Sequence, residues 1–193
     1  MAQRVFIIHG WGGKPEHGWY QWMTDEMTAR NIEAHNLSMP NTDNPLPDEW
    51  ISAIEKAVGT PDAETYFVTH SLSCQAIIRY AATLPADIML GGALFVAGFF
   101  GEITGLDDVD QEHYRTHWLA KSFDANVATK HLGPSVALFS DNDKYVPLDC
   151  QNAFKDFLNA KILVMHNRGH FSGDTNTTEL PEGRDELLAL MKR

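Results

Sequence analysis

TYFVTHSLSCQAIIRY, residues 65–80, begins as a run of β-branched and aromatic residues and ends as a helix-forming run. Ser71 lies at the junction. A serine on a tight strand-to-helix turn exposes its hydroxyl at the edge of a sheet, where nucleophiles are held, usually within the signature G-x-S-x-G. Here Thr69 and Ser73 replace the two glycines, so the stretch on its own also fits a serine that caps a helix.

The rest of the chain repeats this change from short apolar runs to longer amphipathic runs. Such alternation predicts βαβ units, whose right-handed crossovers build a mainly parallel sheet covered by helices on both faces. We therefore expect a three-layer α/β/α fold with about six strands, in a single domain over residues 1–193. The strands are expected near residues 5–8, 32–37, 66–69, 90–96, 136–139 and 162–165, and the helices near 19–30, 47–58, 73–84, 148–159 and 181–191.

Residues 98–133 interrupt this rhythm, because they contain no clear strand and are rich in Asp, His, Tyr, Trp and Phe. A connection of this length in a compact domain is usually functional. We predict a short helical insertion, a candidate lid, over the site. The alternative is an ordinary crossover helix with a loop on the back face of the sheet.

The charge balance limits the classes of partner. The 26 acidic and 15 basic residues give a formal net charge of -11, without a compensating cluster of Lys or Arg, which argues against nucleic acid or an anionic membrane as a partner. The longest apolar run, residues 88–100, is too short to span a bilayer, and the first residues lead directly into a predicted strand without room for a signal peptide. We therefore expect a cytoplasmic protein whose two cysteines, Cys74 and Cys150, are free thiols.

Polar residues follow several predicted strands at their carboxyl ends, where open parallel sheets bind ligands. Ser71 follows the third strand, Asp141 and Asp143 follow the fifth, and His166 and His170 follow the last. The order Ser, Asp, His is that of one type of catalytic triad, in which a carboxylate orients a histidine that takes the proton of the serine. Position at a strand end does not choose between the two aspartates or between the two histidines.

HGWGG, residues 9–13, follows the first predicted strand and brings a glycine-rich backbone to the same edge of the sheet. A tetrahedral intermediate needs preorganised donors for its oxyanion. The backbone N–H groups of Trp11 and Leu72 are the candidates. Glycines let the first loop approach closely, and Leu72 begins a helix whose positive dipole end lies behind its N–H.

Five motifs occur in register: HGWGG with HGWYQW within residues 9–22, VTHSLSCQAI at 68–77, VAGF at 96–99, SDNDKYVP at 140–147 and GHF at 169–171. Over roughly residues 4–172 this set resembles the small serine hydrolases of the α/β-hydrolase fold typified by retinoblastoma-binding protein 9 and YdeN. The resemblance implies an α/β-hydrolase fold trimmed at its N-terminus, with Ser71 as nucleophile, Asp143 as triad acid and His170 as base. YdeN-type elbows also carry a non-glycine residue at the position of Thr69, so we expect a working elbow, held more tightly than one flanked by glycine.

The main functional hypothesis is a serine hydrolase that cleaves small carboxyl esters or thioesters through an acyl-enzyme intermediate. An amidase or aminopeptidase with the same residues is the alternative, and a non-catalytic protein-interaction module is a third reading, because fold does not fix function. A small ester or amide is the expected partner, and no cofactor or metal is implied, since the helical pair His113 and His117 lacks the glutamate of a zincin motif. The residues expected to contact substrate are His9, Trp11, Phe99, Tyr114 and Trp118.

Overall fold

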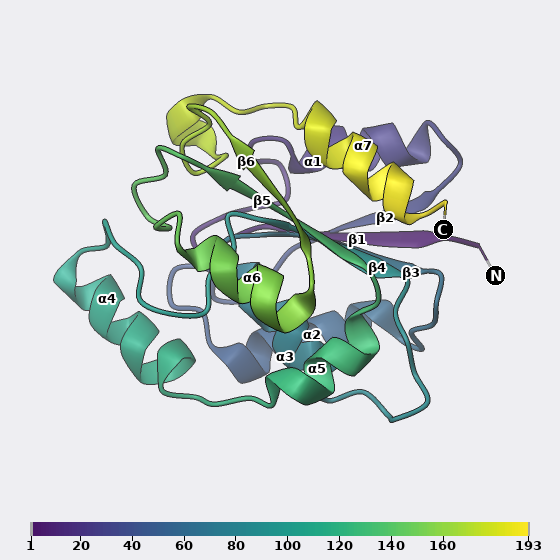
Figure 1. Cartoon of the computed structure of the whole chain (residues 1–193), viewed down its shortest axis with the longest axis horizontal. Coiled ribbons are helices and arrows are strands. Elements are labelled where there is room, and N and C mark those ends of the chain that lie inside the picture. The colour runs from purple at the N-terminus through teal and green to yellow at the C-terminus, as the bar shows by residue number, and fades with distance from the viewer. Residues whose placement is uncertain (1, 193) are drawn as a thin grey trace.

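Six parallel strands form one sheet in the computed structural model, which describes residues 2–192 (Figure 1). Every neighbouring pair of strands is parallel, so the carboxyl ends of all six meet at one edge. The predicted strands are confirmed with ends that differ by one or two residues, while the two ends of the predicted 1–193 domain lie outside the described residues. Across the sheet the order is β2 (Glu33–Leu37), β1 (Arg4–Ile8), β3 (Thr65–His70), β4 (Gly92–Val96), β5 (Ser135–Ser140) and β6 (Lys161–Met165).

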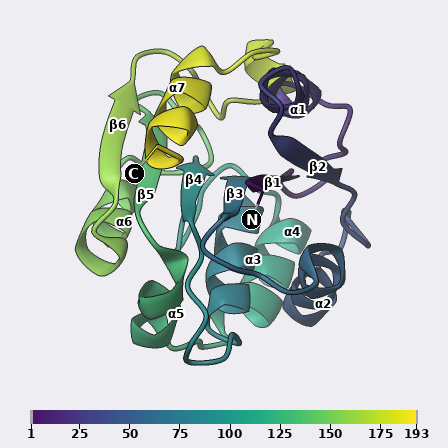
Figure 2. The same cartoon turned by 90° about the vertical axis from the view of Figure 1, so that its right-hand side faces the viewer.

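Helices cover both faces of the sheet, which confirms the predicted three layers (Figure 2). The alternation of β1 explains the two cores, since Val5 and Ile7 point into one and Phe6 and Ile8 into the other. One face carries α1 (Tyr20–Thr28) and α7 (Pro181–Leu190), and the other carries α2 (Pro47–Val58), α3 (Leu72–Ala81), α5 (Ala125–Leu132) and α6 (Cys150–Leu158).

The central strands β3 and β5 are buried along their whole length, as expected for strands covered on both faces. Residues 98–133 contain α4 (Asp108–Tyr114), the π-helix η1 (Arg115–Leu119) and α5. The first half of this segment, residues 98–121, contains α4 and η1 and is called the insertion from here on; its role as a lid stays a prediction. The alternative describes the second half, because α5 packs against α3 on a face of the sheet as an ordinary crossover helix.

The insertion is held to α3 by buried polar side chains. Arg79 is buried on α3 and donates to the backbone carbonyls of Trp118 and Lys121, at 2.6 Å each. One turn earlier, Gln75 Nε2 donates to Tyr114 Oη at 3.0 Å. The carbonyl groups at the end of η1 therefore have a fixed partner on the helix that follows Ser71.

Cys74 and Cys150 are both free, as expected. Burial raises the pKa of Cys74 to about 12, so this thiol stays protonated at neutral pH and is a poor nucleophile. Within residues 2–192, none of the helices combines the length and the apolar character needed to cross a membrane.

Candidate active site

Ser71 lies on a sharp turn between β3 and α3. Its backbone has φ 57° and ψ −123°, a conformation that residues other than glycine rarely adopt. Such a conformation persists only where the surrounding structure enforces it. Its N–H donates to Val96 O at 2.8 Å, and its carbonyl accepts from Cys74 N–H at 3.0 Å. These bonds fix the turn from both sides and present the Ser71 hydroxyl at the carboxyl edge of the sheet.

The residues at the two glycine positions of the signature are accommodated by polar contacts. Ser73 Oγ accepts from His70 N–H at 2.9 Å and lies 2.9 Å from Ile8 O. Thr69 is fully buried, and its Oγ1 lies 3.3 Å from Cys74 Sγ. Ser73 thus bonds to β3 and β1, and Thr69 bonds to α3.

The backbone of the first loop approaches the elbow very closely. A Cβ atom added at Gly10 would lie 2.9 Å from Ser71 Cβ and 3.3 Å from His70 O, closer to Ser71 than real Cβ contacts allow. Glycine is therefore required at position 10 by the contact between the two loops.

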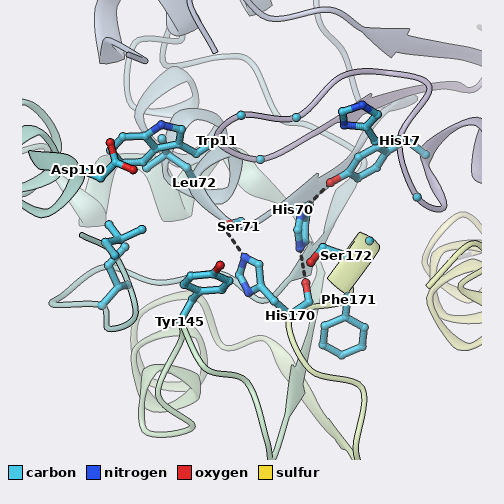
Figure 3. Close-up of a pocket in the computed structure, with 18 of the residues that line it drawn as sticks. Trp11, His17, His70, Ser71, Leu72, Asp110, Tyr145, His170, Phe171 and Ser172 are labelled. Atoms are coloured by element: carbon cyan, nitrogen blue, oxygen red, sulfur yellow. Dashed lines mark hydrogen bonds between the residues drawn. The ribbon is translucent and has the colours of Figure 1, made fainter. Parts of the chain in front are cut away.

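Ser71, His170 and Asp143 form a continuous chain of hydrogen bonds. His170 Nε2 lies 3.0 Å from Ser71 Oγ, as the dashed line in Figure 3 marks, and His170 Nδ1 lies 2.8 Å from Asp143 Oδ2. Asp143 Oδ1 accepts from the backbone N–H groups of Tyr145 and Val146, which leaves Oδ2 for the histidine. Because a carboxylate only accepts, Nδ1 carries the proton and Nε2 is free to accept from the serine hydroxyl.

The rival candidates occupy a different place. The side chain of His166 is 81% exposed, whereas those of His170 and Asp143 are 10% and 2% exposed. Neither Asp141 nor His166 lines the cavity above Ser71. Of the four candidates, Asp143 and His170 are the two that hydrogen bonds link to Ser71 within the described residues.

Trp11 and Leu72, whose backbone N–H groups the sequence suggests as oxyanion donors, both lie at the cavity that contains Ser71. Neither N–H donates a hydrogen bond to a protein acceptor within residues 2–192. In the trans peptide that joins Gly10 to Trp11, the carbonyl and the N–H point in opposite directions. Gly10 O is held by His9 Nδ1 at 2.8 Å and by Gly13 N–H at 3.1 Å, which fixes the direction of the Trp11 N–H.

This contact corrects the prediction that His9 touches substrate. His9 is fully buried, donates from Nδ1 to Gly10 O and accepts from Met39 N–H at Nε2. Burial lowers the pKa of His9, which favours the neutral ring that both hydrogen bonds require. The side chain supports the loop from behind.

Tyr114 and Trp118 also lie outside the cavity lining, which corrects two more predicted substrate contacts. Both side chains are fully buried. Tyr114 Oη donates to Gly101 O at 2.7 Å, and Trp118 Nε1 donates to Pro45 O at 2.7 Å. These aromatic groups fix the insertion to its surroundings.

The cavity has a volume of about 920 Å³ and extends from Ser71 beneath the insertion. Trp11 and Phe99 line it as predicted, and Figure 3 shows Trp11 and Asp110 on one side of Ser71 and Tyr145 beside His170. The other apolar and aromatic lining residues are not among the predicted substrate contacts, although Tyr20, Tyr145 and Phe171 lie in the quoted motifs. These residues are Tyr20, Ile103, Leu106, Tyr145 and Phe171.

Three carboxylates, those of Glu16, Asp43 and Asp110, line the same cavity, whereas its lining contains no Lys or Arg. Within residues 2–192, no cluster of three His, Cys, Asp or Glu side chains has the arrangement of a metal site. The rings of the helical pair His113 and His117 lie 4.6 Å apart between centres and are tilted by 49°, and His113 Nε2 donates to Pro45 O.

Known proteins resemble the chain over all or most of its length. YdeN of Bacillus subtilis (strain 168) is 28% identical over 193 residues, which cover 100% of this chain and 98% of YdeN. Its crystal structure has a TM-score of 0.90 at 26% identity and covers 100% of both chains. Serine hydrolase RBBP9 of Rattus norvegicus is 24% identical over 172 residues, 87% of each chain.

The fold also recurs in a more distant protein. Est1E from Butyrivibrio proteoclasticus, whose structure contains ferulic acid, has a TM-score of 0.72 at 14% identity and covers 100% of this chain and 90% of its own. This likeness shows the α/β-hydrolase fold. The model of the serine hydrolase family matches residues 5–189, and the chain therefore belongs to the serine hydrolase family.

Proposed function

We propose that this serine hydrolase cleaves small carboxyl esters or thioesters through a triad of Ser71, His170 and Asp143 and an acyl-enzyme intermediate. The observation that carries the proposal is the hydrogen-bonded chain from Ser71 Oγ through His170 to Asp143 Oδ2, with distances of 3.0 and 2.8 Å. A serine hydroxyl becomes an effective nucleophile only when a positioned base takes its proton. His170 has the tautomer and the distance for that role.

In the first half of the proposed reaction, Ser71 Oγ attacks the carbonyl carbon while its proton passes to His170 Nε2. His170 then gives this proton to the leaving alcohol or thiol as its bond to the acyl carbon breaks. In the second half, water attacks the acyl-enzyme and loses a proton to His170, which returns it to Ser71 as the acid leaves. Asp143 stabilises the imidazolium in both halves.

The N–H groups of Trp11 and Leu72 supply the proposed oxyanion site, and each such donor typically contributes about 10²–10³ in rate. The apolar side chains of Trp11, Phe99 and Leu106 line the cavity and favour an apolar acyl or leaving group. The size and apolar lining of this cavity support a small-molecule substrate.

A fluorophosphonate probe and a panel of p-nitrophenyl acyl esters test this proposal. The wild-type protein should be labelled and should hydrolyse short esters, and Ser71→Ala should remove both signals. The kcat should fall by about 10⁶ in Ser71→Ala or His170→Ala, because the triad acts as a unit. Labelling that persists in Ser71→Ala, or a folded wild type without Ser71-dependent labelling, would overturn the role of Ser71.

Amide hydrolysis of an aminopeptidase type is a second candidate, because three carboxylates and no Lys or Arg line the cavity. This charge favours a substrate with a free amino group over an anionic one. Aminoacyl p-nitroanilides and their N-acetyl derivatives separate the two candidates. A preference of more than about 10-fold in kcat/KM for the free amine would favour the aminopeptidase, provided that Asp110→Asn removes it. A tenfold preference corresponds to about 1.4 kcal/mol of interaction with the amino group.

A further inference from the structure

His70 lies beside the proposed nucleophile and is 3% exposed. Its Nε2 is 2.7 Å from the backbone oxygen of His170, and its Nδ1 is 2.7 Å from Tyr20 Oη. The rings of His70 and His170 are 4.8 Å apart between centres, and Figure 3 shows the two side by side next to Ser71. His70 therefore touches the main chain of the residue that is proposed to act as the base.

The direction of these hydrogen bonds follows from the partners. A carbonyl oxygen only accepts, so His70 Nε2 carries a proton and donates to His170 O. In the neutral ring, Nδ1 then accepts from the hydroxyl of Tyr20, whose pKa is raised by burial so that the phenol keeps its proton. One buried chain of hydrogen bonds thus joins the start of α1, the end of β3 and the loop that follows β6.

The loop that carries His170 gains two anchors from the start of α1. Phe171, the next residue, has a φ of 52°, a left-handed conformation that needs support from its surroundings. Trp19 Nε1 donates to Phe171 O at 2.9 Å. Adjacent residues at one helix start therefore hold two successive carbonyls of the loop, Trp19 directly and Tyr20 through His70.

We propose that Tyr20 and His70 are positioning residues that hold the main chain of His170 at the distance from Ser71 that proton transfer requires. The inference rests on the proposed function, because it assigns the geometry of the same site. Asp143 orients the ring of His170, whereas His70 fixes its backbone. A displacement of about 1 Å at a reacting pair can cost about 10² in rate, so support of the loop has a direct effect on turnover.

Three variants test the chain of bonds with a p-nitrophenyl ester that the wild type hydrolyses. His70→Phe keeps a ring but removes both polar atoms, and kcat should fall by about 10²-fold with KM nearly unchanged. His70→Gln can still donate to His170 O through its amide, and should recover kcat to within about 10-fold of the wild type. Tyr20→Phe removes a single oxygen and should lower kcat by about 5-fold, the size of one neutral hydrogen bond.

His131→Phe is the matched control, because His131 is also buried and its Nδ1 lies 2.6 Å from a backbone oxygen, that of Ile88. His131→Phe should lower the free energy of unfolding in urea as His70→Phe does. Its kcat should stay within about twofold of the wild type, because His131 shares no hydrogen-bond partner with the site. Titration of Ser71 with the fluorophosphonate gives kcat per active site and corrects for any unfolded fraction.

A double-mutant cycle of Tyr20→Phe and His70→Phe measures whether their effects on kcat are coupled, which a loss of stability alone would not produce. If Tyr20 acts through His70, Tyr20→Phe should lower kcat by less than about twofold in the His70→Phe background. The proposal is overturned if His70→Phe keeps the kcat of His131→Phe, or if only KM changes. Should His70→Phe fail to fold, an unchanged kcat in Tyr20→Phe overturns it. A wild type without ester turnover or Ser71 labelling would instead refute the proposed function.

Discussion

Asp141 Oδ2 lies 2.6 Å from His166 Nδ1, so the two residues that compete in the sequence with Asp143 and His170 are hydrogen-bonded to each other. Asp141 Oδ1 also accepts from the N–H of Asn167, and this bond, with the His166 contact, lowers the pKa of Asp141. A second acid–histidine pair thus stands at the surface and joins the loop after β5 to the loop after β6. It repeats the residue types of the proposed triad without a serine.

The two aspartates should differ sharply when each is replaced by asparagine. Asp143→Asn should lower kcat by about 10⁴, because the amide favours the wrong tautomer of His170. Asp141→Asn should leave the free energy of unfolding nearly unchanged, as expected for an exposed pair, and leave kcat within a few-fold. Ester kinetics and urea unfolding of both variants measure this. Equal losses of kcat would contradict the assignment.

Gly10→Ala should impair catalysis through contact with the elbow. The added Cβ would meet Ser71 Cβ at 2.9 Å, so either the first loop or the elbow must shift. We expect kcat to fall by about 10–10²-fold, since the proposed oxyanion donor and the nucleophile move apart. Gly101→Ala is the control, because its Cβ would have no neighbour within 4 Å. An unchanged kcat in Gly10→Ala would show that the contact is not required.

Thr69→Gly restores the usual residue of the elbow signature and should still destabilise the protein. The variant loses the contact between Thr69 Oγ1 and Cys74 Sγ, leaves a void and adds backbone freedom. We expect a loss of about 2–3 kcal/mol in the free energy of unfolding, with kcat within a few-fold of the wild type. Thr69→Ser keeps the hydroxyl and should lose about 1 kcal/mol. A glycine variant as stable as the wild type would mean that Thr69 does not tighten the elbow.

The buried neutral His9 should make folding stability depend on pH. Its pKa is about 6.5 in the unfolded chain and lower in the folded protein, because burial disfavours the charged ring. The unfolded chain therefore binds a proton that the folded protein does not, and the free energy of unfolding should decrease as the pH falls from about 6.5 toward the folded pKa. Urea unfolding between pH 5 and 7.5 should show a shallower decrease in His9→Asn than in the wild type. Parallel curves would contradict this contribution.

The layers, the strand positions and the strand-end location of the site could be read from the sequence, because each depends on local patterns. The run 65–80 changes from strand-forming to helix-forming residues at one point, and parallel pairing then brings the other strand ends to the same edge. The order of Ser71, Asp143 and His170 could be predicted for the same reason.

The direction of individual side chains could not be predicted, since it depends on packing between distant segments. His9 begins the first loop, but its Nε2 accepts from the N–H of Met39, 30 residues away. Trp118 lies in the insertion but donates to Pro45 O, 73 residues away. Asp143 and His170 could be preferred over Asp141 and His166 only through the family resemblance. The backbone N–H groups that follow Asp143 orient its carboxylate, and the spacing of residues along the loop does not predict this local turn.

Buried Arg79 ties the insertion to the helix that begins beside Ser71. Arg79 and Gln75 hold the insertion from α3, the same helix that begins beside Ser71, and residues 103–110 of the insertion form the wall across from the serine. Ser71 and the segment that carries that wall are therefore attached to the same helix. We expect acyl chains longer than the space between Ser71 and residues 103–110 to be poor substrates.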